Sequence, residues 1–383
     1  MGWFGSLMSL PYMVLFFLVW TVASILRPII MATALAALLY PSATLRKVRL
    51  FLVTLRYLLF SNDKKWKKPK EDPASFFPPA TAVMDKKTIV FVRHGESTWN
   101  DTFNRGDRSV PVFLLCFLPN LVRSVFWEWY FFVTGKADES WFYDSPLSAK
   151  GLGQARGVRQ FLSKNLAYAT PREAELMRVL LGQPTEPKDN NNNNNSNNKS
   201  GSSSSSSQLV SSNLRRAIAT TVVGFQDRLE QRMEGDSVMI LPHLQEISRN
   251  PDALSITPAH GRVVGAWTDP PEIAGLVHHA MDTVHHTGNK PIDSNGWKRM
   301  DAFCRFCFHN VTKDNIVATG HSLWFRSFFR TYLPHTLEHT AKKRKLVNGG
   351  CVGFSLLRTV TPHDQTEHYM IDPKSITVLY GGF

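Results

Sequence analysis

The first forty residues of the chain are almost entirely apolar. No charged side chain occurs from Met1 to Leu26, and Leu7–Leu26 is a nearly continuous apolar run of the ~20 residues that a helix needs to cross a bilayer. A secretory signal would begin with positive charge and have a shorter apolar core, so a membrane segment is the better interpretation. A second run, Ile29–Tyr40, is too short to span alone. The anchor is therefore a single span, or a hairpin kinked at Pro28.

Positive charges follow this apolar block and do not precede it. Between Leu45 and Phe60, three arginines fall on one side of a helix whose other positions are mostly Leu, Val and Phe. This pattern predicts an interfacial helix, and a core helix with an exposed basic stripe is the alternative. Residues 1–60 are thus expected to form a membrane anchor and interfacial helix. The distribution of Lys and Arg predicts that the rest of the chain faces the cytosol. The sequence does not say which membrane is involved.

A basic and proline-rich stretch comes next. Lys64–Lys70 holds five lysines around Trp66, which favours binding to lipid headgroups. Residues 61–87 are predicted to be a linker.

Short apolar runs then alternate with helical patterns to the end of the chain. Strands are predicted at Thr88–Val92, Gln208–Ser212, Ser237–Leu241 and Asn315–Thr319, and helices at Leu214–Arg232 and Leu323–Tyr332. This alternation predicts an α/β fold over residues 88–383, a three-layer α/β/α sandwich with a mostly parallel sheet.

Two insertions interrupt this domain. The first covers about 108–140 and contains the apolar stretch Val110–Val133, which Pro119, Arg123 and Glu128 break. We expect it to lie on the membrane or to pack on the N-terminal helices rather than to form a second span, and a core helix pair is the alternative. The second, about 186–208, is rich in Asn and Ser and is predicted to be a disordered loop.

Charge and cysteine content limit the partners. The net charge is +13, but residues 1–87 hold 12 Lys and Arg against 4 Asp and Glu, so the basic excess belongs mainly to the membrane-proximal quarter. We therefore expect a membrane and no nucleic acid as partner. The four cysteines lack the spacing of a disulfide framework, which indicates a reducing compartment. Cys304 and Cys307 are best interpreted as small apolar residues on a helix.

The candidate chemistry lies at the ends of the predicted strands. Arg93-His94-Gly95 follows the first, Arg215-Arg216 the second and His321 the last, while Glu246 lies just beyond the third. Open α/β sheets place ligands at this edge, and Gly95 would let the backbone approach one. Imidazole can attack phosphorus, arginines can hold phosphoryl oxygens, and a glutamic acid can protonate a leaving oxygen.

This set resembles the histidine phosphatase superfamily, in its phosphoglycerate-mutase-like branch. The similarity covers roughly residues 86–383. It rests on five segments in family order: Arg93 to Asn100, Asp144 to Ser148 with Gly151 and Gln154-Ala155, Ser211 to Thr220, Glu246, and Gly320-His321 with Arg326.

The resemblance implies a role for each site residue. His94 would be phosphorylated, Glu246 would donate the proton, and His321 would join Arg93 and Arg216 in binding the phosphoryl group. Asn100 and Ser97 would contact the substrate, and neither metal nor cofactor would be needed. Arg216 is preferred to Arg215 because it directly precedes Ala217, and Arg215 is expected to be solvated.

Hydrolysis is favoured over mutase action. The glycolytic mutases continue past their glutamate with an arginine, a tyrosine and a glycine-rich stretch, whereas here Glu246 is followed by Ile247 to Ala253 without that pattern. The sequence thus predicts a membrane-anchored phosphomonoesterase. A phosphoglycerate-type mutase and a catalytically silent membrane scaffold are the alternatives. A small molecule, a lipid headgroup and a phosphoprotein all remain open as substrates.

Overall fold

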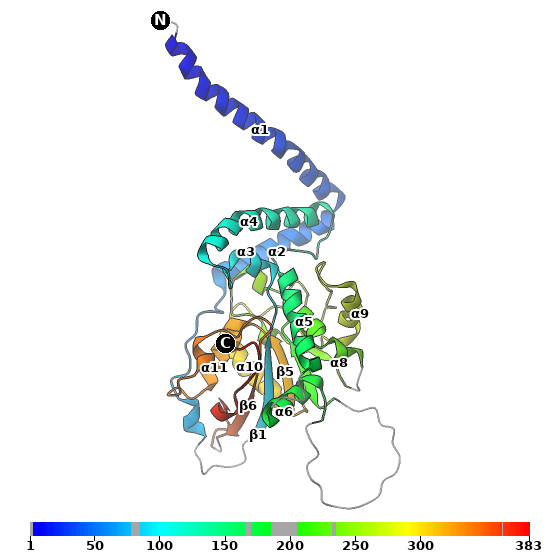
Figure 1. Cartoon of the computed structure of the whole chain (residues 1–383), viewed down its shortest axis with the longest axis vertical. Coiled ribbons are helices and arrows are strands. Elements are labelled where there is room, and N and C mark those ends of the chain that lie inside the picture. The colour runs from blue at the N-terminus through cyan, green and yellow to red at the C-terminus, as the bar shows by residue number, and fades with distance from the viewer. Residues whose placement is uncertain (1–2, 78–84, 165–169, 185–204, 232–234, 362) are drawn as a thin grey trace, which may run out of the picture.

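An eight-stranded sheet forms the centre of the molecule (Figure 1). The computed structural model describes residues 3–77, 85–164, 170–184, 205–231, 235–361 and 363–383. The sheet order is β4-β3-β2-β5-β1-β6-β7, and β8 also pairs with β6. The strands are β1 (Asp85–Arg93), β2 (Ser207–Ser211), β3 (Val238–Ile240), β4 (Met281–Asp282), β5 (Asn315–Gly320), β6 (Cys351–Val360), β7 (Glu367–Ile371) and β8 (Thr377–Tyr380). The five strands from β4 to β1 are parallel and β6 is antiparallel to its neighbours, which confirms the mostly parallel sheet.

Helices cover both faces of this sheet and make the predicted three-layer sandwich. Successive side chains of β1 point to opposite faces, and Ile89 and Phe91 enter one apolar cluster while Val90 and Val92 enter the other. The first layer consists of α10 (Gly296–His309), α11 (Ser322–Tyr332) and α12 (Thr340–Lys343). The second consists of α5 (Ala149–Lys164), α6 (Pro171–Leu181), α7 (Arg215–Gly224), α8 (Gln226–Glu230) and α9 (Pro271–Ala280). A strand buried on both sides is a continuous apolar run, which is why β1 is visible in the sequence.

The predicted elements differ from the observed ones mainly at their ends. The helix expected over Leu214–Arg232 is divided into α7 and α8 at Phe225. Most of the predicted Asn/Ser-rich loop, 186–204, lies outside the described residues, and its last two residues, Ser207 and Gln208, already belong to β2. Cys304 and Cys307 are buried in α10, as expected for apolar positions.

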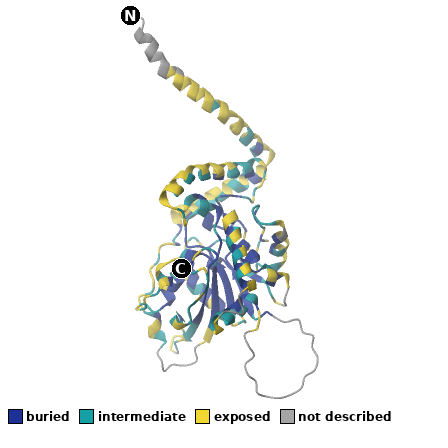
Figure 2. Ribbon diagram, viewed as in Figure 1, coloured by how far each residue is buried: buried dark blue, intermediate teal, exposed yellow. Residues whose placement is uncertain are grey.

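Three further helices lie beside the sandwich. The helix α1 (Trp3–Leu39) extends away from the domain, while α2 (Pro41–Phe60) and α4 (Val110–Val133) lie across one end of it (Figure 1). Among the described residues, Val14–Leu39 of α1 and the whole of α4 are long and apolar enough to cross a membrane. Most of the described side chains of α1 are exposed (Figure 2). Because α1 continues through Pro28 without a turn, the hairpin alternative is wrong.

The apolar insertion forms one helix and not a helix pair. Pro119 lies inside α4, and the helix continues past it. The Glu128 carboxylate pairs with Lys47 of α2 at 2.9 Å, and Trp129 Nε1 donates to Thr33 Oγ1 of α1 at 3.1 Å. The expectation that this insertion packs on the N-terminal helices is therefore confirmed. Its outward face, with Leu114, Leu115 and Leu118 among others, is exposed.

The prediction that residues 61–87 form a linker is partly wrong. Ser61 and Asp63 are buried, and Trp66 packs against the core cluster that contains β1 and α11. The 3-10 helix Pro73–Phe76 also contacts the domain, where Phe76 stacks on His368 with ring centroids 3.7 Å apart. The domain therefore includes residues well before 88. Sequence pattern missed this because a single buried carboxylate among lysines leaves no periodic signal.

Candidate active site

The two histidines meet at the carboxyl ends of adjacent parallel strands. Arg93, the last residue of β1, is in register with Gly320, the last residue of β5, so His94 and His321 follow at the same edge. The His94 amide donates to the Gly320 carbonyl at 3.0 Å, and the two imidazole centroids lie 4.8 Å apart. The sheet topology thus brings together residues that are 227 positions apart.

His94 is held as a neutral imidazole with a defined tautomer. Its Nδ1 lies 2.5 Å from the Gly95 carbonyl oxygen, which can only accept, so Nδ1 carries the proton and Nε2 carries the lone pair. The side chain is 2% exposed, and burial together with Arg216 and Arg93 holds the pKa of His94 well below its ordinary value. An uncharged imidazole with an unprotonated Nε2 is the form that can act as a nucleophile.

Arg216 lies against this lone pair. It stands in the first turn of α7, is 2% exposed, and its Nε lies 3.4 Å from His94 Nε2. Its other nitrogens contact Asp252, with NH1 at 2.5 Å from the carbonyl and NH2 at 3.5 Å from Oδ2. Burial raises the pKa of Asp252 to about 6 although Arg216 lowers it. Asp252 was not predicted, because its partner Arg216 is 36 positions away in the sequence.

Arg93 and His321 each have a buried nitrogen without a protein partner. Arg93 NH1 donates to the Leu346 carbonyl at 2.6 Å, while its Nε has no hydrogen bond within the described residues. His321 is fully buried, its Nε2 lies 2.9 Å from Ser212 Oγ, and its Nδ1 is likewise unpaired. Burial lowers the pKa of Arg93 to about 10 and holds that of His321 well below its ordinary value. Unpaired buried groups beside two arginines suit an anion that is bound in turnover.

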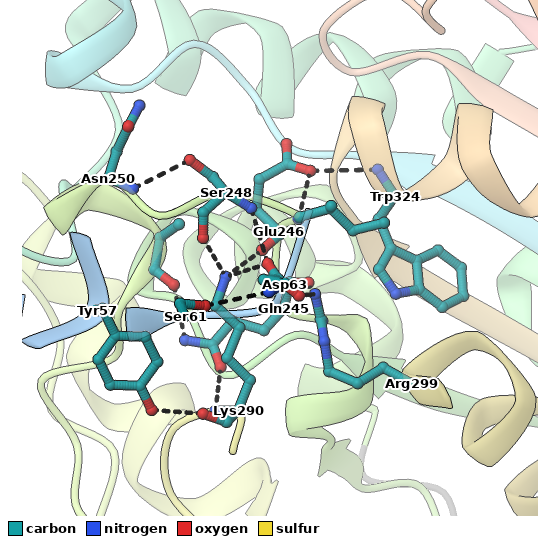
Figure 3. A network of polar contacts seen from close by, with 12 residues as sticks. Tyr57, Ser61, Asp63, Gln245, Glu246, Ser248, Asn250, Lys290, Arg299 and Trp324 are labelled. Atoms are coloured by element: carbon teal, nitrogen blue, oxygen red, sulfur yellow. Dashed lines mark hydrogen bonds and ion pairs between the residues drawn. The ribbon is translucent and has the colours of Figure 1, made fainter. Parts of the chain in front are cut away.

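Glu246 reaches the site from the opposite layer. It follows the 3-10 helix Pro242–Leu244, and its Oε1 accepts from the amide of Trp324 at 3.2 Å, in the first turn of α11 (Figure 3). Its own neighbour Ile247 donates to the same oxygen at 3.0 Å. The charge of Glu246 raises the pKa of Arg93, against the larger lowering effect of burial. Because α11 starts directly after His321, the acid and the second histidine are positioned by the same helix.

Packing alone requires a glycine at position 95, and whether its backbone approaches a ligand stays a prediction. A Cβ at Gly95 would lie 2.3 Å from the carbonyl oxygen of Gly151 in α5, and one at Gly151 would lie 2.0 Å from the Glu96 carbonyl oxygen. The turn after β1 and the start of α5 are therefore in backbone contact. The Gly95 amide also donates to Thr220 Oγ1 of α7 at 3.0 Å.

A cavity of about 620 Å³ opens next to Arg93 and Asn100, which both line it. His94 and His321 are not in its lining, but Asn348, which is, donates through Nδ2 to the His94 carbonyl at 3.0 Å. The full lining comprises Arg93, Glu96, Asn100, Asn104, Gly106, Asp107, Lys150, Gln154, Lys345, Val347 and Asn348. Asn348 and Lys150 were not predicted, and no motif marks them.

The prediction that Ser97 contacts the substrate stays a prediction. Ser97 is fully buried and, like His94, outside the cavity lining, and its Oγ accepts from the Asn100 amide at 3.2 Å as the N-cap of α3 (Thr98–Phe103). The prediction for Arg215 is wrong. Arg215 is not solvated: it is buried and pairs with Glu139 at 2.9 Å. It therefore fastens the segment after α4 to the start of α7, and Arg216 alone faces the histidines.

No group of three or more His, Cys, Asp or Glu side chains that could hold a metal ion occurs in the part of the chain that the structure describes. The donors that do converge are arginine and histidine nitrogens, which suit a phosphoryl group.

Comparisons with known proteins give low similarity. No family model and no curated protein matches the chain. Among solved structures, a putative alpha-ribazole-5'-P phosphatase from Escherichia coli is 13% identical, with a TM-score of 0.33, over 78% of this chain and 97% of that one. A phosphoserine phosphatase from Entamoeba histolytica is 14% identical, with a TM-score of 0.31, over 77% and 97%. A phosphoglycerate mutase from Bacillus anthracis is 14% identical, with a TM-score of 0.32, over 75% and 92%. Similarity of this size assigns no activity, so the function is inferred from the residues of the site itself.

Proposed function

We propose that the chain is a membrane-anchored phosphomonoesterase of the histidine phosphatase superfamily, which works through a phosphohistidine at His94. The observation that carries this proposal is the neutral His94 imidazole, whose Nε2 lone pair faces Arg216 beside the unpaired nitrogens of Arg93 and His321. Cationic and neutral nitrogen donors around a nucleophile match a transferring phosphoryl group. The family resemblance adds that neither metal nor cofactor is required.

The reaction has two steps. In the first, His94 Nε2 attacks phosphorus, the bond to the ester oxygen breaks, and that oxygen takes the proton of the Glu246 carboxyl group. Arg93, Arg216 and His321 bind the three equatorial oxygens as charge is redistributed. In the second, water attacks phosphorus and loses a proton to the Glu246 carboxylate, the nitrogen–phosphorus bond breaks, and His94 regains its lone pair. Inorganic phosphate is released.

The segment after Glu246 supports hydrolysis over mutase action. Its backbone is bound inside the domain: the Ser248 amide donates to Asp63 at 2.9 Å and the Ser248 carbonyl accepts from Lys290 at 2.6 Å. What favours hydrolysis is the sequence of this segment, which lacks the arginine, tyrosine and glycine-rich pattern of the glycolytic mutases. The second candidate is a phosphoglycerate-type mutase. A purified mutase would move phosphate within a bisphosphate-primed substrate and would not release inorganic phosphate, so an assay of phosphate release distinguishes the two.

The positions of the helices support anchoring with the site near the bilayer. We propose that α1 spans the membrane and that α2 and α4 lie on its cytosolic surface. The positive charges follow α1, as expected for the cytosolic side. The helix α3, which begins four residues after His94, touches α4 through Thr102 and Ser124, whose hydroxyls are 2.9 Å apart. The proposed substrate is a phosphomonoester close to this surface, of small-molecule, lipid-headgroup or phosphoprotein class.

The test uses the full chain in detergent or nanodiscs. Wild type should release phosphate from a generic aryl phosphate, and labelled substrate should leave acid-labile, base-stable phosphate on the protein. His94→Ala should lose both, at least about 10³-fold in kcat, because the nucleophile is gone. His279→Ala, a change of an exposed histidine on α9, is the control. If wild type and His94→Ala are equally inactive over a broad panel of phosphomonoesters, the enzyme proposal fails and the scaffold remains.

A further inference from the structure

A buried carboxylate joins the membrane-proximal helix to the loop of the proposed acid. Asp63 lies three residues after the end of α2 and is 1% exposed. Its two oxygens contact two buried cations, Lys290 Nζ at 2.8 Å and Arg299 NH2 at 2.6 Å (Figure 3). Its own amide donates to Ser61 Oγ at 3.2 Å. The position of Asp63 is thus fixed both by the chain that leaves α2 and by the domain core.

Both cations hold the backbone around Glu246. Lys290 Nζ donates to the carbonyl of Glu246 at 2.5 Å and to that of Ser248 at 2.6 Å. Arg299 NH1 donates to the Gln245 carbonyl in a short hydrogen bond. Asp63 also accepts from the Ser248 amide. The peptide groups on either side of the proposed acid are therefore held by one buried ion cluster.

The cluster depends on the charge of Asp63. Burial opposes that charge, but Lys290 and Arg299 outweigh it, and the pKa of Asp63 is lowered. Burial lowers the pKa of Lys290 to about 8 although Asp63 raises it. Without the carboxylate, two buried cations would face each other and be expected to move apart. Any such movement displaces the Glu246 backbone that they hold.

We propose that Asp63 is a positioning residue for Glu246, and that through it the end of α2 controls the proton-transfer step. This inference rests on the proposed function, in which Glu246 protonates the leaving oxygen. It predicts a defect that depends on the leaving group. An aryl oxygen that leaves readily needs little protonation, while an alkyl oxygen needs the acid.

The experiment compares Asp63→Asn with wild type in the full chain on two substrates, an activated aryl phosphate and an alkyl phosphate. The expected result is a loss in kcat/KM that is about tenfold greater on the alkyl phosphate than on the aryl phosphate. The ratio kcat/KM reports the step in which the leaving oxygen is protonated, and misplacement of a general acid removes part of its ~10²–10⁴-fold effect. In a Glu246→Gln background, Asp63→Asn should add no such discrimination.

Asp236→Asn is the matched control. Asp236 is also a buried carboxylate, paired with Arg228 at 2.7 Å, but it precedes β3 at the opposite edge of the sheet. It should lower the activity on both substrates by the same factor. Equal losses in Asp63→Asn would overturn the inference and leave the proposed function intact. Inactivity of wild type, or full activity of Glu246→Gln, would instead contradict the proposed function.

A second variant covers the case in which Asp63→Asn does not fold. Arg299→Lys keeps the buried positive charge but cannot reach both Asp63 and the Gln245 carbonyl in the same geometry. It should show the same selective loss on the alkyl phosphate. If it lowers both activities equally, Asp63 and its partners are purely structural.

Discussion

At the residue scale, the chemistry of the site depends on which protonation state burial selects. His94 and His321 are both enclosed, and their low pKa values arise from burial first and from Arg216 second. The same arginine therefore helps to keep His94, the proposed nucleophile, neutral, and in the proposed reaction it would supply charge for the phosphoryl oxygens. Because Asp252 fixes Arg216 from behind, the distance between Arg216 and His94 is set by the 3-10 helix Pro251–Ala253.

The low pKa of His94 predicts a pH dependence of stability. In the folded protein His94 stays neutral below pH 6.5, whereas in the unfolded chain it takes a proton near its ordinary pKa of about 6.5. The free energy of unfolding is therefore unaffected by His94 above this pH, and it decreases as the pH falls toward 5. His94→Gln removes one such group, so its Tm should fall less steeply than that of wild type in thermal unfolding between pH 7 and 5.

His278→Gln serves as the control for this titration. His278 is exposed on α9, so its replacement should leave the steepness of the wild-type curve unchanged. An identical pH dependence in His94→Gln and wild type would contradict the assignment of a neutral buried His94.

At the scale of elements, the site depends on the contact between the turn after β1 and the helix α5. The two glycines at this contact, Gly95 and Gly151, leave no room for a side chain. The bridge between Ser97 and Leu147 continues the same contact. The motif Arg93-His94-Gly95 thus combines two residues of the proposed site with a glycine that packing requires.

Gly151→Ala should damage both stability and activity. The new Cβ would meet the Glu96 carbonyl oxygen at 2.0 Å, so the turn that carries His94 must shift. We expect a loss of ~1–3 kcal/mol in the free energy of unfolding and a lower kcat. Denaturant unfolding and phosphate release measure the two effects.

Gly153→Ala, on the same helix, is the matched control. A Cβ there meets nothing within 4 Å, so it should gain ~0.5–1 kcal/mol from helix propensity and leave kcat unchanged. Equal effects of the two substitutions would show that the close contact does not shape the site.

At the scale of the whole molecule, the N-terminal helices and the α/β domain form one connected structure. The chain leaves α2 at Phe60 and is already buried at Ser61 and Asp63, so α2 joins the core directly. Tyr57 of α2 also donates to the Lys290 carbonyl in a short hydrogen bond. A displacement of α2 would therefore move Asp63 and Lys290, which hold the backbone around Glu246.

This arrangement predicts where the chain can be shortened. A chain that starts at residue 41 keeps Asp63, while one that starts at residue 72 leaves Lys290 and Arg299 without their counter-charge. The shorter chain should be less stable by ~3–5 kcal/mol, the usual result of breaking a buried ion pair. Unfolding of the two purified chains in urea tests this difference.

The chain that starts at residue 41 with Asp63→Asn separates the lost charge from the lost packing of α2. It should retain α2 and still lose most of the same stability. If the chain from residue 72 is as stable as the chain from residue 41, the buried cluster does not join the two parts.

The sequence by itself determined the α/β class, the strands that are buried on both faces, the apolar N-terminal helix, and the residues around His94, Arg216 and His321. These features are local: a continuous apolar run specifies a central strand, and a strand end is marked by the residues next to it. Only the tertiary structure decided that α1 continues through Pro28, that Ser97 is a helix cap, that Arg215 is buried, and that Asp63 belongs to the core. The burial of Arg215 and Asp63 depends on partners distant in the sequence, because a buried charge is stabilised only by the counter-charges and hydrogen bonds that the fold places next to it.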